Sequence, residues 1–179
     1  MSSTPAVPLY SCQYDCAVGD LSIICSDAGL VAVLWPGEVR VPLPGVPTRV
    51  ARNAQPLLST ACQQLDEYFT GMRTTFDLPL TPNGTEFQLA AWQALRAIPY
   101  GETRSYAEQA TTIGRPTAVR AVGSANGKNP ISIIVPCHRV IGSNGSLTGF
   151  GGGLDAKTYL LQLERRVAGH PSGPTSLFD

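Results

Sequence analysis

The chain has 179 residues, and its 13 Lys and Arg residues balance 13 Asp and Glu residues. Hydrophobic residues make up 43% and charged residues 15%, which is typical of a globular protein and excludes a disordered or strongly charged chain. Residues 1–80 hold 4 basic and 7 acidic residues, whereas residues 81–179 hold 9 and 6. The C-terminal half is therefore the better candidate for contact with a polyanion.

The N-terminal eight residues lack the basic flank and apolar core of a signal peptide, and no stretch approaches the ~20 apolar residues of a membrane span. We therefore expect a soluble, cytoplasmic protein with no membrane partner. Its five cysteines are an odd number in an unexported chain, which argues against a disulfide framework. At least one thiol is expected to be free.

Residues 1–80 are typical of a small α+β domain. The apolar runs 21–25 and 30–34 are joined by turn residues and predict a β-hairpin. Apolar residues then recur at helical spacing over 58–69, with a glycine following as a stop. The Pro-, Asn- and Gly-containing run 78–84 predicts a domain boundary, which leaves a second domain over 81–170 and a tail over 171–179.

The second domain begins with three predicted helices, over 85–98, 105–114 and 116–127. Capping boxes open the first two, formed by Thr85 with Gln88 and by Ser105 with Glu108. Pro116 stands at a first-turn position of the third helix. The short second and third helices, joined by a turn, indicate a helix-turn-helix. Any all-α domain can contain such a pair, so DNA binding is one of two interpretations at this point.

The third predicted helix has one apolar and one polar face. The packing face is predicted to consist of Ala118, Ala121, Val122 and Ala125. The outer face is small and polar, with Arg120 as its one long cation, and consists of Thr117, Arg120, Ser124 and Gly127. Such a face favours the close approach of another molecule, while the alternative is that Arg120 is an ordinary solvated arginine.

The apolar run 131–135 predicts a buried strand or extended segment that leads to Cys137 and His138. A free thiol has a pKa of about 8.5, and a neighbouring imidazole can take its proton and create a nucleophile. In an extended chain adjacent side chains point apart, so we expect the proton to pass through a bend or a bridging water. The alternative is an inert Cys–His pair in a core.

Glu164 falls within the apolar stripe of a last helix predicted over 155–168. A carboxylate on a packing face is costly unless it has a partner, and His138 is the attractive one. Cys137, His138 and Glu164 then form a nucleophile, a base and an orienting group. The alternative places Glu164 at the helix rim. The glycine-rich run 142–153 lacks the ending of a phosphate-binding loop, but its Phe150 can form the wall of a flat pocket.

The run 134–142, Ile-Val-Pro-Cys-His-Arg-Val-Ile-Gly, resembles the active-site signature of the O6-alkylguanine-DNA alkyltransferases, also called methylated-DNA–protein-cysteine methyltransferases. Further motifs of that family follow in the same order, and the ordered set is far more specific than any one of them. They are Pro99-Tyr100-Gly101-Glu102-Thr103, Ser105-Tyr106, Gly114-Arg115-Pro116, Val119-Arg120-Ala121-Val122-Gly123, Asn129-Pro130, Gly149-Phe150, Gly152-Gly153 and the Lys157 to Glu164 helix. The resemblance covers about residues 84–166.

The resemblance implies roles for the matching positions. Cys137 is the alkyl acceptor, and His138 and Glu164 activate it through water. Asn129 holds the reactive segment, and Tyr106 protonates the departing base. Arg120 enters the base stack in place of the flipped nucleotide, from a recognition helix that lies in the minor groove. The remaining implied DNA contacts are Thr117, Ser124, Ala121, Gly123 and Ser105. The implied guanine pocket is lined by the backbone around Cys137, Val140, Phe150 and Gly151, together with Ser143 and Gly149.

The resemblance also implies the fold and the activity. We expect an α+β protein, with a small ribonuclease-H-like N-terminal domain containing a short antiparallel sheet and a mostly helical, winged helix-turn-helix-like C-terminal domain. The expected partner is double-stranded DNA containing O6-alkylguanine, from which the alkyl group passes irreversibly to Cys137, with O4-alkylthymine as a further substrate. A monomer is expected, and the sequence leaves open whether it binds DNA cooperatively.

Two positions depart from the family pattern, since Phe150 stands where tyrosine is usual and Gly151 where some members carry serine. Some members also bind a structural zinc in the N-terminal domain. Here that half has Cys12, Cys16, Cys25 and Cys62 but no histidine and no paired C-x-x-C, so we expect no metal and no cofactor. The alternative functions are a non-catalytic alkyltransferase-like damage binder, which the presence of Cys137 disfavours, and a cysteine hydrolase.

Overall fold

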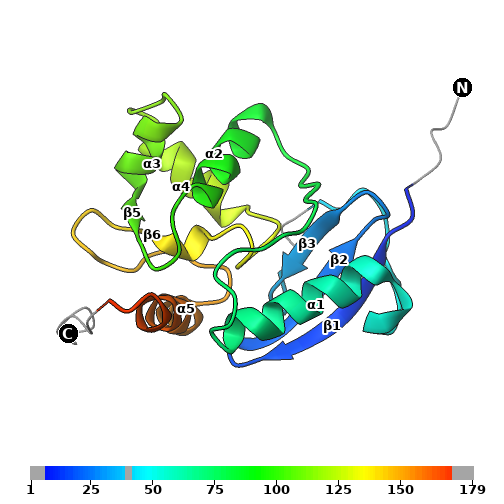
Figure 1. The fold of residues 1–179 in the computed structure, drawn as a ribbon. Coiled ribbons are helices and arrows are strands. Elements are labelled where there is room, and N and C mark those ends of the chain that lie inside the picture. The colour runs from blue at the N-terminus through cyan, green and yellow to red at the C-terminus, as the bar shows by residue number, and fades with distance from the viewer. Residues whose placement is uncertain (1–6, 39–41, 171–179) are drawn as a thin grey trace, which may run out of the picture.

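The computed structural model describes residues 7–38 and 42–170. Figure 1 shows an N-terminal sheet covered by one helix, beside a C-terminal half built mainly of helices. This arrangement confirms the expected α+β class. The expected tail, 171–179, lies outside the described residues.

The N-terminal sheet has four strands in the order β3-β2-β1-β4. They are β1 (Tyr10–Cys16), β2 (Gly19–Cys25), β3 (Leu30–Leu34) and β4 (Thr48–Arg49). The predicted hairpin is present as the antiparallel pair β2 and β3, and β1 pairs antiparallel with β2 and parallel with β4. The sequence prediction omitted β1, although the alternation of buried Cys12 and Tyr14 with exposed neighbours is the period of a half-buried strand.

Helix α1 (Pro56–Phe69) follows a single 3₁₀ turn, η1 (Arg52–Ala54), and packs on the sheet as Figure 1 shows. Its buried side chains recur at helical spacing and include Leu58, Leu65 and Tyr68. Gly71 then takes a φ of 77°, the left-handed conformation that commonly ends a helix. The predicted helix and its stop are therefore confirmed, and α1 carries Tyr68 toward the C-terminal half.

Two later segments of the chain run along the free edge of β3. Leu80, in the predicted boundary region, forms a parallel bridge with Leu30, and Ile131 forms another with Val33. The Val33 amide donates to the Pro130 carbonyl at 2.8 Å, and the Ser132 amide donates to the Val33 carbonyl at 3.2 Å. The N-terminal sheet therefore supports the segment that leads to Cys137.

The C-terminal half contains α2 (Glu86–Arg96), β5 (Arg104–Ser105), α3 (Tyr106–Thr112), α4 (Val119–Gly127), the 3₁₀ turn η2 (Cys137–Arg139), β6 (Val140–Ile141) and α5 (Leu154–Val167). Both predicted capping boxes are present. Gln109 and Asn126 exchange side-chain hydrogen bonds of 2.9 and 2.7 Å, and the Trp92 indole donates to the Ala125 carbonyl at 2.8 Å. These bonds fix α4 against α2 and α3.

Helix α4 begins three residues later than predicted. The Ala118 amide donates to the Arg115 carbonyl at 2.8 Å, which closes a β-turn with Pro116 at its second position. The fixed φ of Pro116 therefore serves a turn, and the prediction that it opens the helix was wrong. Ala121 is exposed, contrary to its predicted place on the packing face, and Asn126 is buried there instead.

The apolar run 131–135 is buried, but the prediction of a strand or extended segment was wrong beyond Ile131. The Ile134 amide donates to the Ser132 carbonyl at 2.8 Å, so the segment makes a γ-turn at Ile133, whose φ is 71°. The Cys137 amide donates to the Val135 carbonyl at 2.9 Å across Pro136 in a second tight turn. A β-branched residue with positive φ costs about 1–3 kcal/mol, and the buried apolar side chains around it offset that strain.

Helix α5 closes the C-terminal half, and its buried face includes Lys157, Leu160 and Glu164. Figure 1 places it below η2 and beside the lower end of α1. Among the helices of the described ranges, none has the length and apolar character needed to cross a membrane.

Candidate active site

Cys137 opens the single turn of 3₁₀ helix that also contains His138 and Arg139. The thiol is half-buried and faces a pocket, whereas His138 is fully buried and Arg139 is nearly so. Because the backbone bends at this point, the two neighbouring side chains occupy different environments. The expected bend is therefore present, and it separates an accessible thiol from an enclosed imidazole.

The buried imidazole of His138 meets the carboxylate of Glu164, with Nε2 and Oε1 2.7 Å apart. Burial by itself would raise the pKa of the Glu164 carboxyl. The contacts with His138 and Arg139 outweigh burial and hold that pKa below its usual range. An ionised carboxylate only accepts hydrogen bonds, so Nε2 carries the proton and Nδ1 keeps a free electron pair. Burial also lowers the pKa of His138, which favours this neutral tautomer.

Glu164 receives hydrogen bonds from three further groups. Arg139 donates from Nε to Oε2 at 2.8 Å and from Nη2 to Oε1 at 3.0 Å. The Tyr68 hydroxyl donates to Oε1 at 2.7 Å, and the Gly101 amide donates to Oε2 at 3.2 Å. The Glu164 carboxylate is therefore buried and hydrogen-bonded to several segments of the chain, and it does not lie at the helix rim.

Asn129 fixes the turns that precede the thiol. Its Nδ2 donates to the Val135 carbonyl at 2.8 Å, and its Oδ1 accepts from the Ile131 amide at 3.0 Å. The Asn129 amide also acts on the Cys137 thiol, where it lowers the pKa against the larger, opposite effect of burial. This buried side chain thus joins both ends of the irregular segment.

Lys157 supplies a buried positive charge near the thiol. Its Nζ donates to the Val140 carbonyl at 2.6 Å and to the Thr148 carbonyl at 3.0 Å. Burial lowers the pKa of Lys157 to about 8, and its charge lowers the pKa of Cys137. The Thr148 carbonyl also accepts from the Tyr106 hydroxyl at 3.2 Å, so one carbonyl ties α5 and α3 to the glycine-rich loop.

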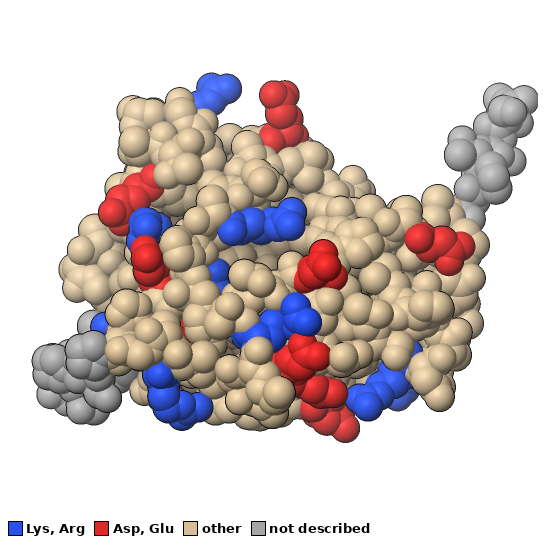
Figure 2. Space-filling view, viewed as in Figure 1, with Lys and Arg blue, Asp and Glu red and all other residues tan. Residues whose placement is uncertain are grey.

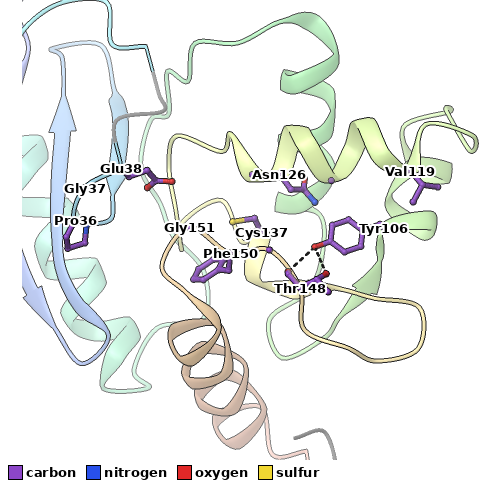
Figure 3. A pocket seen from close by; sticks show the side chains of 13 residues that line it. Pro36, Gly37, Glu38, Tyr106, Val119, Asn126, Cys137, Thr148, Phe150 and Gly151 are labelled. Atoms are coloured by element: carbon purple, nitrogen blue, oxygen red, sulfur yellow. Dashed lines mark hydrogen bonds between the residues drawn. The ribbon is translucent and has the colours of Figure 1, made fainter.

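The thiol faces a pocket of about 660 Å³. Figure 3 shows Cys137, Tyr106 and Phe150 around its centre, with Glu38 reaching toward Gly151 from the N-terminal domain. The lining residues come from the segment after β3, from α3 and α4, from η2 and from the glycine-rich loop. They are Pro36, Gly37, Glu38, Tyr106, Val119, Gly123, Asn126, Gly127, Cys137, Thr148, Gly149, Phe150 and Gly151.

Three of the five residues assigned to the guanine pocket line this cavity, namely Gly149, Phe150 and Gly151. Val140 and Ser143 do not. The Val140 side chain is fully buried in the core, because β6 turns it inward. Ser143 is exposed in the turn that follows β6. Their assignment to the guanine pocket, which for Val140 concerns the backbone, stays a prediction.

The residues assigned to DNA contact divide into three groups. Arg120, Ala121 and Ser124 are exposed on α4, and Thr117 is exposed in the turn before it. Gly123 lines the pocket, where a methyl group in place of its hydrogen would lie 3.8 Å from the Tyr106 ring. The Ser105 hydroxyl accepts from the Glu108 amide at 3.2 Å and thus caps α3.

Charged side chains of both signs are interspersed on the face that Figure 2 shows. In the N-terminal half, the sulfur atoms of Cys12 on β1 and Cys62 on α1 lie 3.8 Å apart. Within the described ranges there is no group of three His, Cys, Asp or Glu residues arranged to hold a metal ion.

Family comparisons match both halves of the chain. The family model described as "6-O-methylguanine DNA methyltransferase, ribonuclease-like domain" matches residues 9–82, and that described as "6-O-methylguanine DNA methyltransferase, DNA binding domain" matches residues 86–166. A methylated-DNA–protein-cysteine methyltransferase of Methanosarcina acetivorans is 46% identical over 87% of this chain and 98% of its own. This chain belongs to the methylated-DNA–protein-cysteine methyltransferase family.

Solved structures from the same family share the fold. The crystal structure of the Mycobacterium tuberculosis O6-methylguanine methyltransferase has a TM-score of 0.77 and 44% identity, covering 96% of this chain and 99% of that one. The structure of the M. tuberculosis protein OGT in complex with DNA has a TM-score of 0.75 and 44% identity, covering 88% and 94%. The expected ribonuclease-like N-terminal half therefore agrees with the description of the first family model, and the mostly helical C-terminal half matches the model of the DNA binding domain.

The structure adds four residues to this family member's site that sequence reasoning missed. Arg139 was overlooked as the cation for Glu164, although it is adjacent to His138 in the sequence. Tyr68 and Glu38 belong to the N-terminal domain, and the sequence around each of them does not show which residues of the C-terminal half it contacts. Lys157 gave a usable signal, because it stands on the apolar face of α5 and a lysine there needs buried acceptors.

Proposed function

We propose that this protein repairs DNA by transferring the alkyl group of O6-alkylguanine to the sulfur of Cys137. The observation that carries the proposal is the position of Cys137. Its thiol faces a pocket, while the side chain of its neighbour His138 is buried against Glu164. The family relationship, and the structure of an M. tuberculosis relative in complex with DNA, support this substrate class. Transfer of an alkyl group from O4-alkylthymine is part of the same proposal.

Activation of the thiol begins at Glu164. Because the carboxylate keeps the His138 proton on Nε2, the electron pair on Nδ1 is free to accept a proton. Nδ1 is buried and has no hydrogen-bond partner among the described residues. We infer that a bridging water carries the Cys137 proton to Nδ1, which leaves a thiolate whose charge Lys157 and Asn129 stabilise.

The thiolate then attacks the alkyl carbon in line with the bond to guanine O6. A sulfur–carbon bond forms as the carbon–oxygen bond breaks, and the electron pair of that bond stays with the guanine. Tyr106 lines the same pocket and donates a proton to the departing guanine, which needs one because its anion is a poor leaving group. His138 has then gained the thiol proton and Tyr106 has lost one to guanine. Exchange of one proton from His138 to Tyr106 through solvent restores both groups, so the overall transfer is balanced.

The reacting carbon lies inside the duplex, so the nucleotide must rotate into the pocket. Flipping costs a few kcal/mol, and less when the base is damaged and poorly paired. Arg120 on the exposed face of α4 offsets part of this cost by entering the space left in the stack. The product is a thioether, and the proposed mechanism contains no step that removes the alkyl group from the sulfur. Each molecule is therefore expected to act once. We also expect it to act as a monomer and to need no cofactor.

The test is the intact mass of the protein after it is mixed with a short duplex containing one O6-methylguanine. We expect a gain of one methylene increment, limited to one per chain and located at Cys137. Cys137→Ala should abolish the gain and retain DNA binding, whereas Cys16→Ala, which removes another half-buried thiol, should leave it unchanged. Tight binding without a mass gain would instead support a damage binder, and repeated turnover of an ester would support a hydrolase.

A further inference from the structure

We propose that Tyr100 is a positioning residue for the transfer reaction, and that its aromatic ring holds the Arg139 guanidinium against Glu164. The inference rests on the proposed function, because the Glu164 carboxylate orients the base that activates the thiol. Tyr100 lines a separate cavity of about 190 Å³, which shares no lining residue with the pocket at Cys137. It therefore acts on the reaction through other residues and not by contact with the substrate.

The guanidinium of Arg139 lies over the face of the Tyr100 ring, with Cζ 5.5 Å from the ring centroid. A cation within about 6 Å of an aromatic face is attracted to it, and the attraction is stronger where water is excluded. Arg139 is buried, and two of its nitrogen atoms donate to the Glu164 carboxylate. The ring therefore supports the group that supplies two of the hydrogen bonds to that carboxylate.

Tyr100 also supports the other two donors to Glu164 that accompany Arg139. The Tyr100 and Tyr68 rings pack edge to face with their centroids 6.1 Å apart, and the Tyr68 hydroxyl donates to Glu164 Oε1. The amide of the next residue in the chain, Gly101, donates to Oε2 at 3.2 Å. Both side-chain donors thus pack on the Tyr100 ring, and the backbone donor is its neighbour in the sequence.

The hydroxyl group of Tyr100 does not account for this role. Its oxygen is buried and has no hydrogen-bond partner in the part of the chain that the structure describes. Burial, followed by the charge of Glu164, raises the pKa of Tyr100 to about 12, so the phenol is neutral at physiological pH. Because an unpaired buried hydroxyl is unfavourable, the favourable contacts of this side chain are those of its ring.

The position of the guanidinium affects the proton affinity of His138. Burial is the main cause of the lowered pKa of His138. The charges of Arg139 and Lys157 lower that pKa further, and the contact with Glu164 opposes them. If Arg139 moves away, the pKa of His138 rises, and the imidazole is protonated over a wider range of pH. A protonated imidazole cannot accept the thiol proton, so the acid limb of the transfer rate should move to higher pH.

The experiment compares two aromatic rings of similar size at position 100. Phenylalanine and pentafluorophenylalanine replace Tyr100 in turn, and single-turnover rates of transfer from a duplex containing O6-methylguanine are measured between pH 5 and pH 9. Fluorination withdraws electrons from the ring face and so removes its attraction for a cation. Pentafluorophenylalanine in place of Phe87, a half-buried residue of α2, is the matched control for the chemical change itself.

Tyr100→Phe should keep the acid limb of the unaltered protein, because the ring is retained. The fluorinated ring at position 100 should move the acid limb to higher pH by about 0.5–1 unit, as expected for loss of a buried cation–π contact. The control at position 87 should cause no shift, since a structural disturbance alone changes stability and not the pH dependence.

An unmoved acid limb with the fluorinated ring at position 100 would overturn the proposed role of Tyr100. An equal shift in Tyr100→Phe, or in the control at position 87, would overturn it as well. Absence of any transfer by the unaltered protein would instead overturn the proposed function itself.

Discussion

The guanidinium of Arg139 binds both carboxylate oxygens of Glu164, with N–O distances of 2.8 and 3.0 Å, and its remaining amino group donates to the Ile98 carbonyl at 2.7 Å. Both side chains are buried. Arg139 therefore compensates the same carboxylate that orients His138, which couples the stability of the core to the chemistry of the site.

Arg139→Met should lower the free energy of unfolding by about 3–5 kcal/mol, because it leaves a buried carboxylate without its main compensating charge. Urea unfolding followed by circular dichroism measures this loss. Arg165→Met, on the exposed side of α5, is the control and should stay within about 0.5 kcal/mol of the unaltered protein. Similar unfolding curves for the two variants would show that the buried ion pair is not stabilising relative to methionine.

Acidification should destabilise the protein through Glu164. Its contacts hold its pKa in the folded state below the value of about 4.3 in the unfolded chain, so the unfolded chain takes up the proton first as the pH falls. The stability that Glu164 contributes is fully present above about pH 4.3 and is lost progressively below it. Burial lowers the pKa of His138, which adds a loss in the same direction below about pH 6.5.

Unfolding free energies between pH 3 and pH 8 test this prediction. Glu164→Gln should be less stable at neutral pH and should show a flatter acid limb than the unaltered protein. Glu86→Gln, which alters an exposed carboxylate at the start of α2, should keep the full pH dependence. An equally steep acid limb in Glu164→Gln would mean that other groups dominate the acid response.

Lys157→Met should lower the stability of the protein at the pocket wall and also raise the pKa of the Cys137 thiol. The buried carbonyl of Val140 and the partly buried carbonyl of Thr148 lose a charged donor, which should cost about 1–3 kcal/mol of stability. The pKa of Cys137 should rise because the nearby positive charge is gone, so alkylation of the thiol by iodoacetamide should shift to higher pH. Arg166→Met, exposed on the same helix, is the control. A thiol titration that does not move would separate Lys157 from nucleophile activation.

Arg120→Ala should slow transfer from duplex DNA by about tenfold, since in the proposed mechanism Arg120 offsets part of a flipping cost of a few kcal/mol. Reaction with the free base O6-benzylguanine requires no flipping and should be little affected. The ratio of the two rate constants is the measurement, with Arg52→Ala in the N-terminal domain as the control for loss of one exposed arginine. Equal losses on both substrates would refute the role of Arg120 in the base stack.

The sequence by itself determined the local elements whose signals lie within a few residues. The capping residues Thr85 and Ser105 fix the starts of α2 and α3 by bonds to their own N3 amides, so neighbours in sequence are sufficient to predict them. The order of the reactive motifs likewise identified Cys137 as the candidate nucleophile. The placement of Glu164 within an apolar stripe required a buried partner, and the structure supplies it as His138 at 2.7 Å.

Only the tertiary structure decided which distant groups complete the site. Tyr68 reaches Glu164 across 96 positions of sequence, and Glu38 enters a pocket otherwise built largely by the C-terminal half. The turns at Ile133 and Pro136 are also set by tertiary contacts, because one segment must pair with the edge of β3 and then deliver Cys137 to the pocket. The run of apolar residues predicts that such a segment is buried. The direction of its backbone depends on the distant residues that it packs against in the folded protein.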